Sequence, residues 1–362
     1  MTRRSFETRL VRLRELAGLT RGEWALISDL DDIRYLSGFS GSNGWLLVSA
    51  DRTLLVTDGR YVEQATAETE FDVVEARSVS DMIAAVAERV DGTLLFQSTK
   101  VSVELHAMLS REVSSLRGVG SSFVELRRAK DDDEIAVIER AVAIADRALA
   151  AVCPQIEAGC TERDVRDELD YTMRRLGADG PSYDTIVASG PVNSARPHHR
   201  PTDRRLEVGD ALVVDVGALV DGYHSDLTRT FFIGECPDEL RRRYDLVRRS
   251  QNDGILRVGP GVPCRDVDEA CRKVFRAAEL EDDFVHGTGH GVGLVIHEEP
   301  FLGRTSGSSL RARDVVTVEP GLYRVGIGGI RIEDLLVVGE VGSRVLSTFP
   351  KDLTCLPSRP TI

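Results

Sequence analysis

One segment, residues 211–232, constrains the fold of this chain more than any other part of the sequence. Leu212–Val216 is a continuous apolar run, and His224–Phe232 is rich in threonine and aromatic residues, so both are typical of β-strands. The Asp221-Gly222 pair that separates them is a strong signal for a tight turn. The segment therefore predicts a β-hairpin.

Each arm of this hairpin contains an aspartate, Asp215 in the first and Asp226 in the second. Folding at the turn brings the two carboxylates roughly opposite each other across neighbouring strands. Two negative charges held this close repel, and burying them is costly unless a cation neutralises them. One aspartate facing solvent or capping a turn is the alternative, and we favour a metal ion between them.

Residues 314–339 repeat this arrangement as a strand, a glycine-rich turn and a second strand. Glu319 lies in the first arm, Glu333 lies in the second, and the turn is expected near Gly326. The two hairpins together present four carboxylates, whose charge two divalent cations would balance.

A larger repeat contains both hairpins. Two expected helices, a loop and an acid-bearing hairpin occupy about residues 131–232, and the same order recurs from Pro237. The offsets agree, since 237 − 131 is 106, 319 − 215 is 104 and 333 − 226 is 107. A duplicated half-domain brings its hairpins together around a pseudo-twofold axis, so we expect all four acids in one cleft. The helices are expected over residues 131–152, Thr161–Gly177, Pro237–Val258 and Arg265–Leu280.

The first 126 residues follow another pattern, because short strands alternate with helices, as in an α/β domain with a mixed sheet. The last strand of this domain is expected at Phe123–Leu126, and residues 34–44 are expected to form a glycine- and serine-rich turn. Charge concentrates over Arg127–Asp133, where we place the boundary. We therefore expect an α/β domain over residues 1–126 and an α+β domain over residues 127–362.

Composition excludes several classes of partner. The chain has 362 residues and a net charge of −13, so nucleic acid is not expected, because that affinity depends on clustered Lys and Arg. Six cysteines without a CxxC pair indicate reduced thiols. The N-terminal segment lacks the apolar core of a signal peptide, and no run of about eighteen apolar residues occurs. We expect a cytoplasmic protein with no membrane partner.

The histidines concentrate beside the acids. Six of the seven lie between positions 198 and 297. His290 stands in the segment HGTGHGVG, where alternating glycines let the backbone approach a ligand closely. The spacing is not that of a dinucleotide-binding GxGxxG, and His290 and His297 are too far apart for the HExxH zinc helix. A ligand role for some of these histidines is therefore favoured.

Five residues in these contexts resemble the metal ligands of the M24 metallopeptidases, which include methionine aminopeptidase, aminopeptidase P and prolidase. The motifs that carry the resemblance are VVDVGA, SDLTRTF, GTGHGVGLVIHE, TVEPGLY and RIED. YLSGFSGSNG and VTDGRYVEQA are similar to the additional N-terminal domain of the branch that cleaves Xaa-Pro bonds. The resemblance implies a creatinase-like N-terminal domain followed by a C-terminal domain with the pita-bread fold. The five residues are Asp215, Asp226, His290, Glu319 and Glu333.

The resemblance also implies a role for each ligand. Asp215 binds one metal ion, His290 and Glu319 bind the other, and two acids, Asp226 and Glu333, bridge both. A water held between two cations has a lowered pKa and becomes a nucleophile near neutral pH. Glu319 is implied to shuttle the proton of that water. Ligands that are mostly carboxylate oxygen suit Mn²⁺, with Co²⁺ as a second possibility.

Further residues are implied on the substrate side. His198 and His297 match two family histidines that hydrogen-bond the scissile carbonyl and the tetrahedral intermediate. Arg331 lies two residues before Glu333, so in a strand it shares that face and is expected to orient Glu333 or to bind a substrate carboxylate. Thr228 shares the strand face of Asp226 in the same way and is expected to support that ligand. The alternative for Arg331 and Thr228 is that they are ordinary strand residues without a role in the site.

The resemblance implies a dinuclear metallopeptidase that hydrolyses Xaa-Pro bonds in peptides, and implies a homodimer. We favour an aminopeptidase P over a prolidase, because no extra basic group beside the motifs marks a clamp for the carboxylate of a dipeptide. Arg331 does not decide, since both kinds of enzyme carry an arginine there. Two other classes stay open: a peptide-binding protein that has lost catalysis, and a metal-free amidinohydrolase, against which the five filled ligand positions argue.

Overall fold

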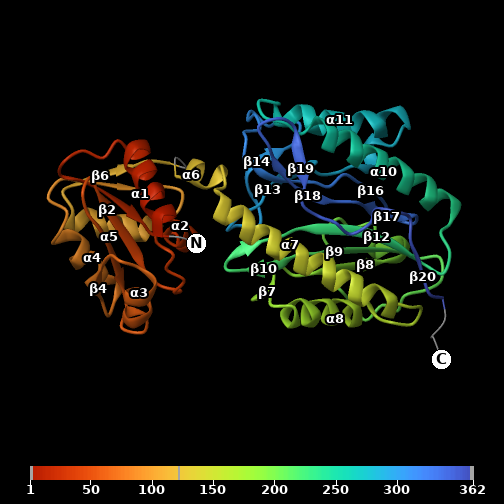
Figure 1. Cartoon of the computed structure of the whole chain (residues 1–362), viewed down its shortest axis with the longest axis horizontal. Helices are drawn as coiled ribbons and strands as arrows, with labels where there is room; N and C mark the ends of the chain where they lie inside the picture. Colours follow the sequence, from red (N-terminus) through yellow and green to blue (C-terminus); the bar gives the residue numbers. More distant parts are fainter. Residues whose placement is uncertain (1–2, 121–122, 359–362) are drawn as a thin grey trace. The chain divides into compact units, whose positions relative to one another are not determined.

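The computed structural model describes residues 3–120 and 123–358. Its chain forms two compact units, residues 1–127 and 128–362. Strands and helices alternate in the first unit, and two pairs of long helices border the strands of the second (Figure 1).

The N-terminal unit is built on a mixed sheet of six strands in the order β4-β3-β2-β1-β5-β6. Strands β1, β2 and β3 pair antiparallel, and the remaining pairs are parallel. The strands are β1 (Glu23–Ile27), β2 (Trp45–Ser49), β3 (Thr53–Thr57), β4 (Asp72–Glu75), β5 (Thr93–Phe96) and β6 (Ser115–Gly118). The helices are α1 (Arg3–Ala17), α2 (Leu30–Ser37), α3 (Val62–Glu68), α4 (Val79–Ala87), α5 (Val103–Glu112) and α6 (Val124–Arg128).

The core of this unit forms where alternate strand residues meet two helices. Trp24, Leu26 and Leu47 point to one face of the sheet, where they pack with Ile83 of α4 and Leu109 of α5. This follows from the two-residue period of a strand, which places every second side chain on the same face. The predicted mixed-sheet α/β architecture is therefore confirmed.

Two local predictions for this unit are wrong. The segment at Phe123–Leu126 is not a strand, because Val124–Arg128 forms α6. A short apolar run does not distinguish a strand from a buried helical turn, and here the helix is formed. The predicted turn at residues 34–44 begins inside α2, which Asp29 caps at its N-terminus and Gly38 ends in a left-handed conformation.

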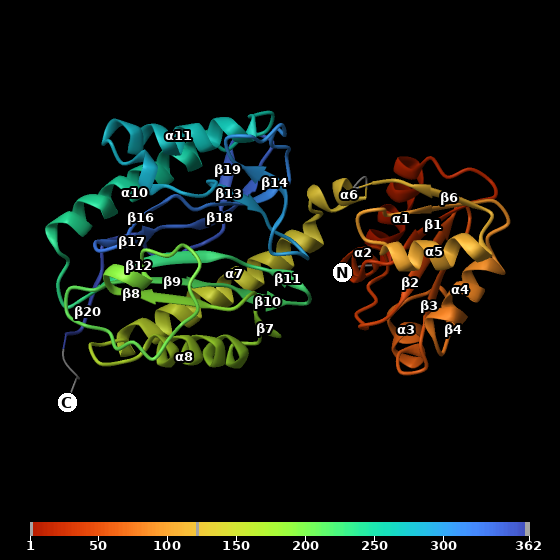
Figure 2. The same ribbon diagram turned by 180° about the vertical axis from the view of Figure 1, so that it is seen from behind.

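In the C-terminal unit the strands lie between two helix pairs, with α7 and α8 on one side and α10 and α11 on the other (Figures 1 and 2). The helices are α7 (Asp132–Val152), η1 (Cys153–Gln155), α8 (Glu162–Arg175), α9 (Gly190–Asn193), α10 (Asp238–Arg257), α11 (Cys264–Ala277) and η2 (Glu281–Asp283). The strands are β7 (Gly180–Pro181), β8 (Ile186–Ser189), β9 (Ala211–Val216), β10 (Ala218–Val220), β11 (Tyr223–His224), β12 (Leu227–Ile233), β13 (Gly289–Gly291), β14 (Glu298–Leu302), β15 (Val315–Val318), β16 (Gly321–Arg324), β17 (Gly328–Arg331), β18 (Asp334–Val338), β19 (Ser343–Val345) and β20 (Cys355–Leu356).

The repeat is visible in the sheets. The two larger sheets have the orders β20-β12-β9-β8 and β14-β13-β15-β18-β19, and each contains the outer strand pair of one predicted hairpin. The strands nearest the two turns lie in the smaller sheets β11-β10-β7 and β16-β17. The four long helices match the predicted ranges within a few residues, and capping boxes at Asp131 and Thr161 fix the starts of α7 and α8. The pseudo-twofold α+β fold is confirmed.

Both hairpins are interrupted, which corrects the predicted register of the first. Asp215 pairs with Thr228 and not with Asp226, which lies two residues earlier on the same face. The strand breaks at Gly217, and the remaining hairpin turns at Asp221-Gly222, both with positive φ. Within the described ranges, the structure contains no helix that is both long and apolar enough for a membrane span.

Candidate metal centre

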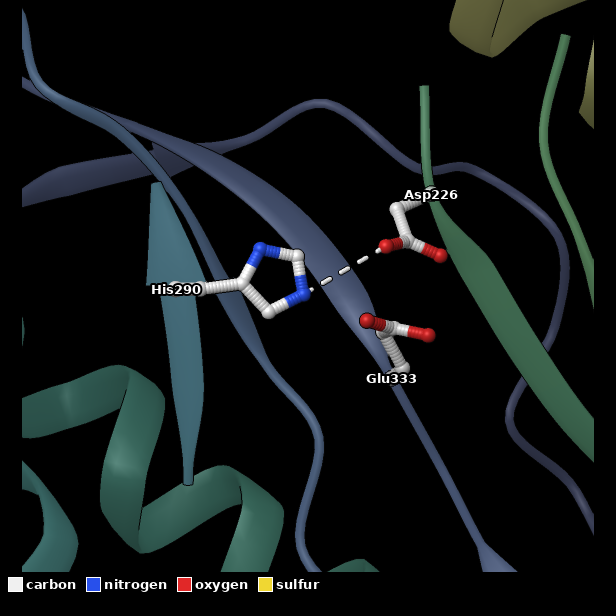
Figure 3. A group of neighbouring side chains, drawn as sticks. All are labelled: Asp226, His290 and Glu333. Carbon is white, nitrogen blue, oxygen red and sulfur yellow. Dashed lines mark ion pairs between the residues drawn. The ribbon is translucent and has the colours of Figure 1, made fainter. Parts of the chain in front are cut away.

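The predicted ligands meet where the two interrupted hairpins face each other. Asp226, His290 and Glu333 offer ligand atoms that all lie within 4.8 Å of one another, and all three residues are buried. His290 projects from β13 toward the two acids, which directly precede β12 and β18 (Figure 3). Segments more than a hundred residues apart in the sequence thus form one cluster.

A tyrosine hydroxyl joins the two aspartates. Tyr183 lies on the loop between β7 and β8, and its hydroxyl contacts Asp226 Oδ1 at 2.5 Å and also Asp215 Oδ1. A phenol carries a single proton, so it donates to one of these carboxylates at a time. The hydroxyl therefore holds the two carboxylates close together without neutralising their negative charges.

Glu333 gives the clearest sign of a cation. Its Oε2 accepts a hydrogen bond from Thr228 Oγ1 at 2.7 Å. Its buried Oε1 has no hydrogen-bond partner in the part of the chain that the structure describes. An orphaned buried carboxylate oxygen is expensive, and it is stabilised when it coordinates a metal ion. The donor set fits the divalent ions that the carboxylates imply.

His290 is oriented for coordination by the backbone of the next residue. Its Nδ1 lies 3.1 Å from the carbonyl oxygen of Gly291, and Nε2 faces Glu319 Oε1 at 3.3 Å and Asp226 Oδ2 at 3.6 Å. A proton on Nδ1 directed at a carbonyl leaves Nε2 free to bind a metal. Glu319 is further held by Thr317 Oγ1 at 3.2 Å.

The electrostatics of the cluster show an excess of negative charge. Burial, followed by the charges of Asp215 and Glu319, raises the pKa of Asp226 well above its usual range. Burial and the charge of Asp226 raise the pKa of Glu333 in the same way. For Glu319, burial alone would raise the pKa, but the hydrogen bond and charge of His290 and the charges of His286 and Arg331 together outweigh it, and the pKa falls to about 2. Divalent cations would relieve this repulsion.

Arg331 belongs to the cluster, and it orients Asp215 directly. Its Nη2 donates to Asp215 Oδ2 at 2.6 Å and its Nε donates to Thr228 Oγ1 at 3.0 Å. Its Nη1 donates to the Pro197 carbonyl and to the Tyr323 hydroxyl, both at 2.9 Å. Of the two predicted roles, orientation matches these contacts, although the acid that Arg331 orients is Asp215. The contact of Thr228 with Glu333 also links the two hairpins.

A cavity of about 390 Å³ opens onto the cluster, a size typical of ligand sites. His198 and His297 both line it, and both side chains are exposed. The ring of His297 lies 4.4 Å from that of His290, centroid to centroid. Partial desolvation at the cavity, followed by the charge of His290, lowers the pKa of His297. The predicted substrate-side histidines are thus brought to the same cavity as the predicted ligands.

For three residues of the site, Tyr183, His286 and Tyr323, the sequence predicted no individual role. Tyr183 carries no sequence signal, because only the folded loop brings its hydroxyl to the aspartates. His286 lines the cavity, and its Nε2 lies 3.0 Å from the hydroxyl of Tyr323, which in turn accepts a hydrogen bond from Arg331. The position of His286 in the glycine-rich histidine segment was the available signal.

The fold and the site together define a metallohydrolase with a carboxylate-rich centre between two duplicated half-domains. The model of metallopeptidase family M24 matches residues 136–340, and the model of the creatinase/prolidase N-terminal domain matches residues 9–129. The chain belongs to metallopeptidase family M24, as the motifs predicted.

Individual relatives cover nearly the whole chain. The uncharacterized peptidase YqhT of Bacillus subtilis is 36% identical over 96% of this chain and 100% of its own length. The structure of an Xaa-Pro dipeptidase from Bacillus anthracis superposes with a TM-score of 0.92 and 34% identity, covering 97% of this chain and 100% of that one. The structure of an X-Pro aminopeptidase from Thermotoga maritima superposes with a TM-score of 0.88 and 35% identity, covering 96% of this chain and 100% of that one. Relatives of comparable similarity thus bear both names.

Proposed function

We propose that this metallopeptidase hydrolyses Xaa-Pro bonds and acts as an Xaa-Pro aminopeptidase that removes the first residue of longer peptides. Membership of family M24 and the names of its relatives support the proline specificity. The Xaa-Pro bond is a tertiary amide without an N–H, so peptidases that grip that N–H do not cleave it. A site that holds the carbonyl through metals and histidines does not need that hydrogen.

One observation carries the preference for an aminopeptidase. Of the described residues that line the cavity, Arg331 is the only lysine or arginine. Its guanidinium already donates to Asp215, Thr228, Tyr323 and the Pro197 carbonyl. It therefore has little capacity left to bind the carboxylate of an Xaa-Pro dipeptide, whereas a longer peptide has no carboxylate at that position.

Five side chains would hold the metal ions: Asp215, Asp226, His290, Glu319 and Glu333. When bound, the ions would polarise the scissile carbonyl and lower the pKa of a water. Glu319 would accept the proton of that water, because its carboxylate stays ionised beside His290. His198 and His297 would hydrogen-bond the carbonyl oxygen as it gains negative charge.

The test compares an Xaa-Pro dipeptide with an Xaa-Pro-Yaa-Zaa tetrapeptide, both with Mn²⁺ present. We expect release of the first residue of the tetrapeptide at a higher kcat/KM than cleavage of the dipeptide. Cleavage of the dipeptide alone would make the enzyme a prolidase. Cleavage of neither, by protein with metal bound, would favour the non-catalytic peptide-binding alternative.

One contact favours the dipeptidase alternative. The exposed Arg200 places Nη2 3.8 Å from Oδ2 of Asp184, which lines the cavity. A surface pair at this distance is weak, so Arg200 is available to a substrate carboxylate. If the enzyme is a dipeptidase, Arg200→Ala should raise the KM for the dipeptide and leave the KM for the tetrapeptide unchanged.

We also propose Mn²⁺ as the metal, with Co²⁺ as an active substitute, because oxygen ligands with one imidazole suit these ions. Metal analysis of protein purified without chelator tests this.

We propose a cytosolic homodimer. The cytosolic location is in line with the six cysteines, all of which are free. A monomeric mass by light scattering would contradict the dimer.

A further inference from the structure

The place of His198 is determined by its backbone. The side chain is exposed, and within the described part of the chain its ring makes no hydrogen bond. It follows α9 (Gly190–Asn193) on a loop that runs to Arg204 without regular structure. A side chain on such a loop is only as well placed as the loop itself.

A single buried carboxylate holds both ends of this loop. Glu162, which is 0% exposed, opens α8 directly after the capping residue Thr161. Its Oε1 accepts hydrogen bonds from the backbone N–H of Ser189 at 2.8 Å, the Ser189 hydroxyl at 2.7 Å and Asn193 Nδ2 at 3.0 Å. The loop is thus fixed before His198.

The other oxygen of Glu162 fixes the loop after His198. Oε2 accepts hydrogen bonds from His199 Nε2 at 3.0 Å, the Thr202 backbone N–H at 2.9 Å and the Thr202 hydroxyl at 2.7 Å. The residue next to His198 in the chain is therefore bonded to this carboxylate. Burial alone would raise the pKa of Glu162, but the hydrogen bonds from Ser189, Asn193, Thr202 and His199 together outweigh it and lower the pKa, so the carboxylate stays ionised.

The opposite side of the loop is attached to the metal centre. Arg331 donates to the Pro197 carbonyl at 2.9 Å, and the same guanidinium donates to Asp215. The Gly329 backbone N–H donates to the Ser194 hydroxyl at 2.8 Å. Glu162 on one side and the Arg331 strand on the other thus hold the loop between them.

We propose that Glu162 is a positioning residue for catalysis, which sets the place of His198 at the cavity by holding residues 189–202. The proposal rests on the role proposed above for His198 in transition-state binding. Glu162 itself does not line the cavity and touches none of the five proposed metal ligands. It should therefore affect kcat through His198 and leave metal binding unchanged.

The first test is Glu162→Gln in the full-length enzyme loaded with Mn²⁺. Glutamine keeps the volume, but its NH₂ group must face donors at Ser189 and Asn193 or at Thr202 and His199. One end of the loop is then released. Displacing a catalytic group by about 1 Å costs on the order of 100-fold, so we expect kcat to fall about 10- to 100-fold with KM little changed. Glu168→Gln, an exposed position of α8, is the matched control.

A double-mutant cycle separates positioning from general damage. In the His198→Ala background, Glu162→Gln should reduce kcat by less than about threefold, because the group that it positions is absent. In the His297→Ala background, it should retain its full effect. His297 has its own anchor, since the next residue, Glu298, accepts a hydrogen bond from buried Lys130 Nζ at 2.6 Å.

Three outcomes would overturn the proposal: equal effects of Glu162→Gln in both backgrounds, unchanged kcat, or a large loss of Mn²⁺ affinity by calorimetry. Should Glu162→Gln not fold, Thr202→Val removes the 2.7 Å hydroxyl contact with Glu162, together with the 3.2 Å hydrogen bond that this hydroxyl accepts from the Arg204 backbone N–H. It should show the same coupling to His198 with a smaller effect. Failure of the proposed function is recognised separately, because wild-type enzyme would then cleave no Xaa-Pro peptide.

Discussion

At the scale of single residues, the site is defined by oxygens that lack a neutralising partner. Glu333 leaves one buried oxygen without a hydrogen bond among the described residues, and the Tyr183 hydroxyl is shared by two aspartates. Arg331 supplies one fixed positive charge to Asp215. Four acids with this little compensation make the centre dependent on cations.

Asp226→Asn tests the role of the most central acid. The change keeps the shape and removes one negative charge beside His290 and Asp215. We expect activity to fall by more than about 100-fold, beyond the 10- to 100-fold typical for residues that only support a ligand. Wild-type turnover at saturating Mn²⁺ would contradict the proposed role of Asp226 in holding the metal ions.

Asp221→Asn is the matched control, since it is the same change in the same hairpin. Asp221 is at the exposed turn with φ +49°, which asparagine also adopts. Its contact with Arg140 Nη2 at 2.6 Å is a surface ion pair of little weight. Activity and metal affinity should match those of the wild type.

Tyr183→Phe removes only the hydroxyl that joins Asp215 and Asp226. Groups that support metal ligands typically contribute 10- to 100-fold in affinity, so we expect Mn²⁺ to bind at least about 10-fold more weakly by calorimetry. Tyr171→Phe, on the exposed surface of α8, should leave the affinity unchanged. Equal affinities of the two variants would show that the Tyr183 hydroxyl is dispensable.

At the scale of elements, a break in each hairpin creates the site. The first strand stops at Gly217 and the second hairpin breaks between β15 and β16, so the acids stand beside irregular backbone. At Gly217 an added Cβ would lie 2.0 Å from the carbonyl oxygen of Ser225, the residue before Asp226. The glycine therefore permits the close approach that turns Asp226 toward the cluster.

Gly217→Ala should displace Ser225 and with it Asp226. Overpacking of this kind costs about 1–3 kcal/mol, and we expect that loss in denaturant unfolding together with weaker Mn²⁺ binding. Gly307→Ala is the control, because a Cβ added at Gly307 would have no described atom within 4 Å. If the free energy of unfolding of Gly217→Ala equals that of the wild type, the close approach of Gly217 to Ser225 does not restrict the site as we infer.

At the scale of the whole chain, one of the two units supplies all of the proposed site residues. The five proposed ligands and both histidines come from the C-terminal unit, where two copies of a helix–helix–hairpin arrangement face each other. Because each half contributes two of the four acids, neither half alone makes the centre. Metal binding should therefore stabilise the association of the two halves.

Metal removal tests this at the same scale. A ligand at 100 times its Kd stabilises a folded protein by about 2.7 kcal/mol, so chelator should lower the unfolding temperature and Mn²⁺ should restore it. Asp226→Asn should show a smaller difference between the two conditions. Identical unfolding temperatures of wild-type protein with and without chelator would contradict a metal centre that bridges the halves.

The sequence by itself determined the two-domain architecture, the duplicated half-domain and the family. These follow from local signals: apolar periodicity, capping residues such as Asp131 and Thr161, and four acids and one histidine in five recognisable motifs. Periodicity and caps act over a few residues, so they can be recognised without the fold. Where the local signal was ambiguous, as at Phe123–Leu126, the prediction was wrong.

Only the tertiary structure decided which groups surround those acids. The register that pairs Asp215 with Thr228, the Tyr183 hydroxyl between two aspartates and the attachment of Arg331 to Asp215 all join segments far apart in the sequence. Glu162 is the clearest case, since as the first residue of a helix it could have been a solvent-exposed acid. Its six donors come from residues 189–202 and meet only when the loop folds over the buried end of α8, because contacts of this kind depend on packing and not on local propensity.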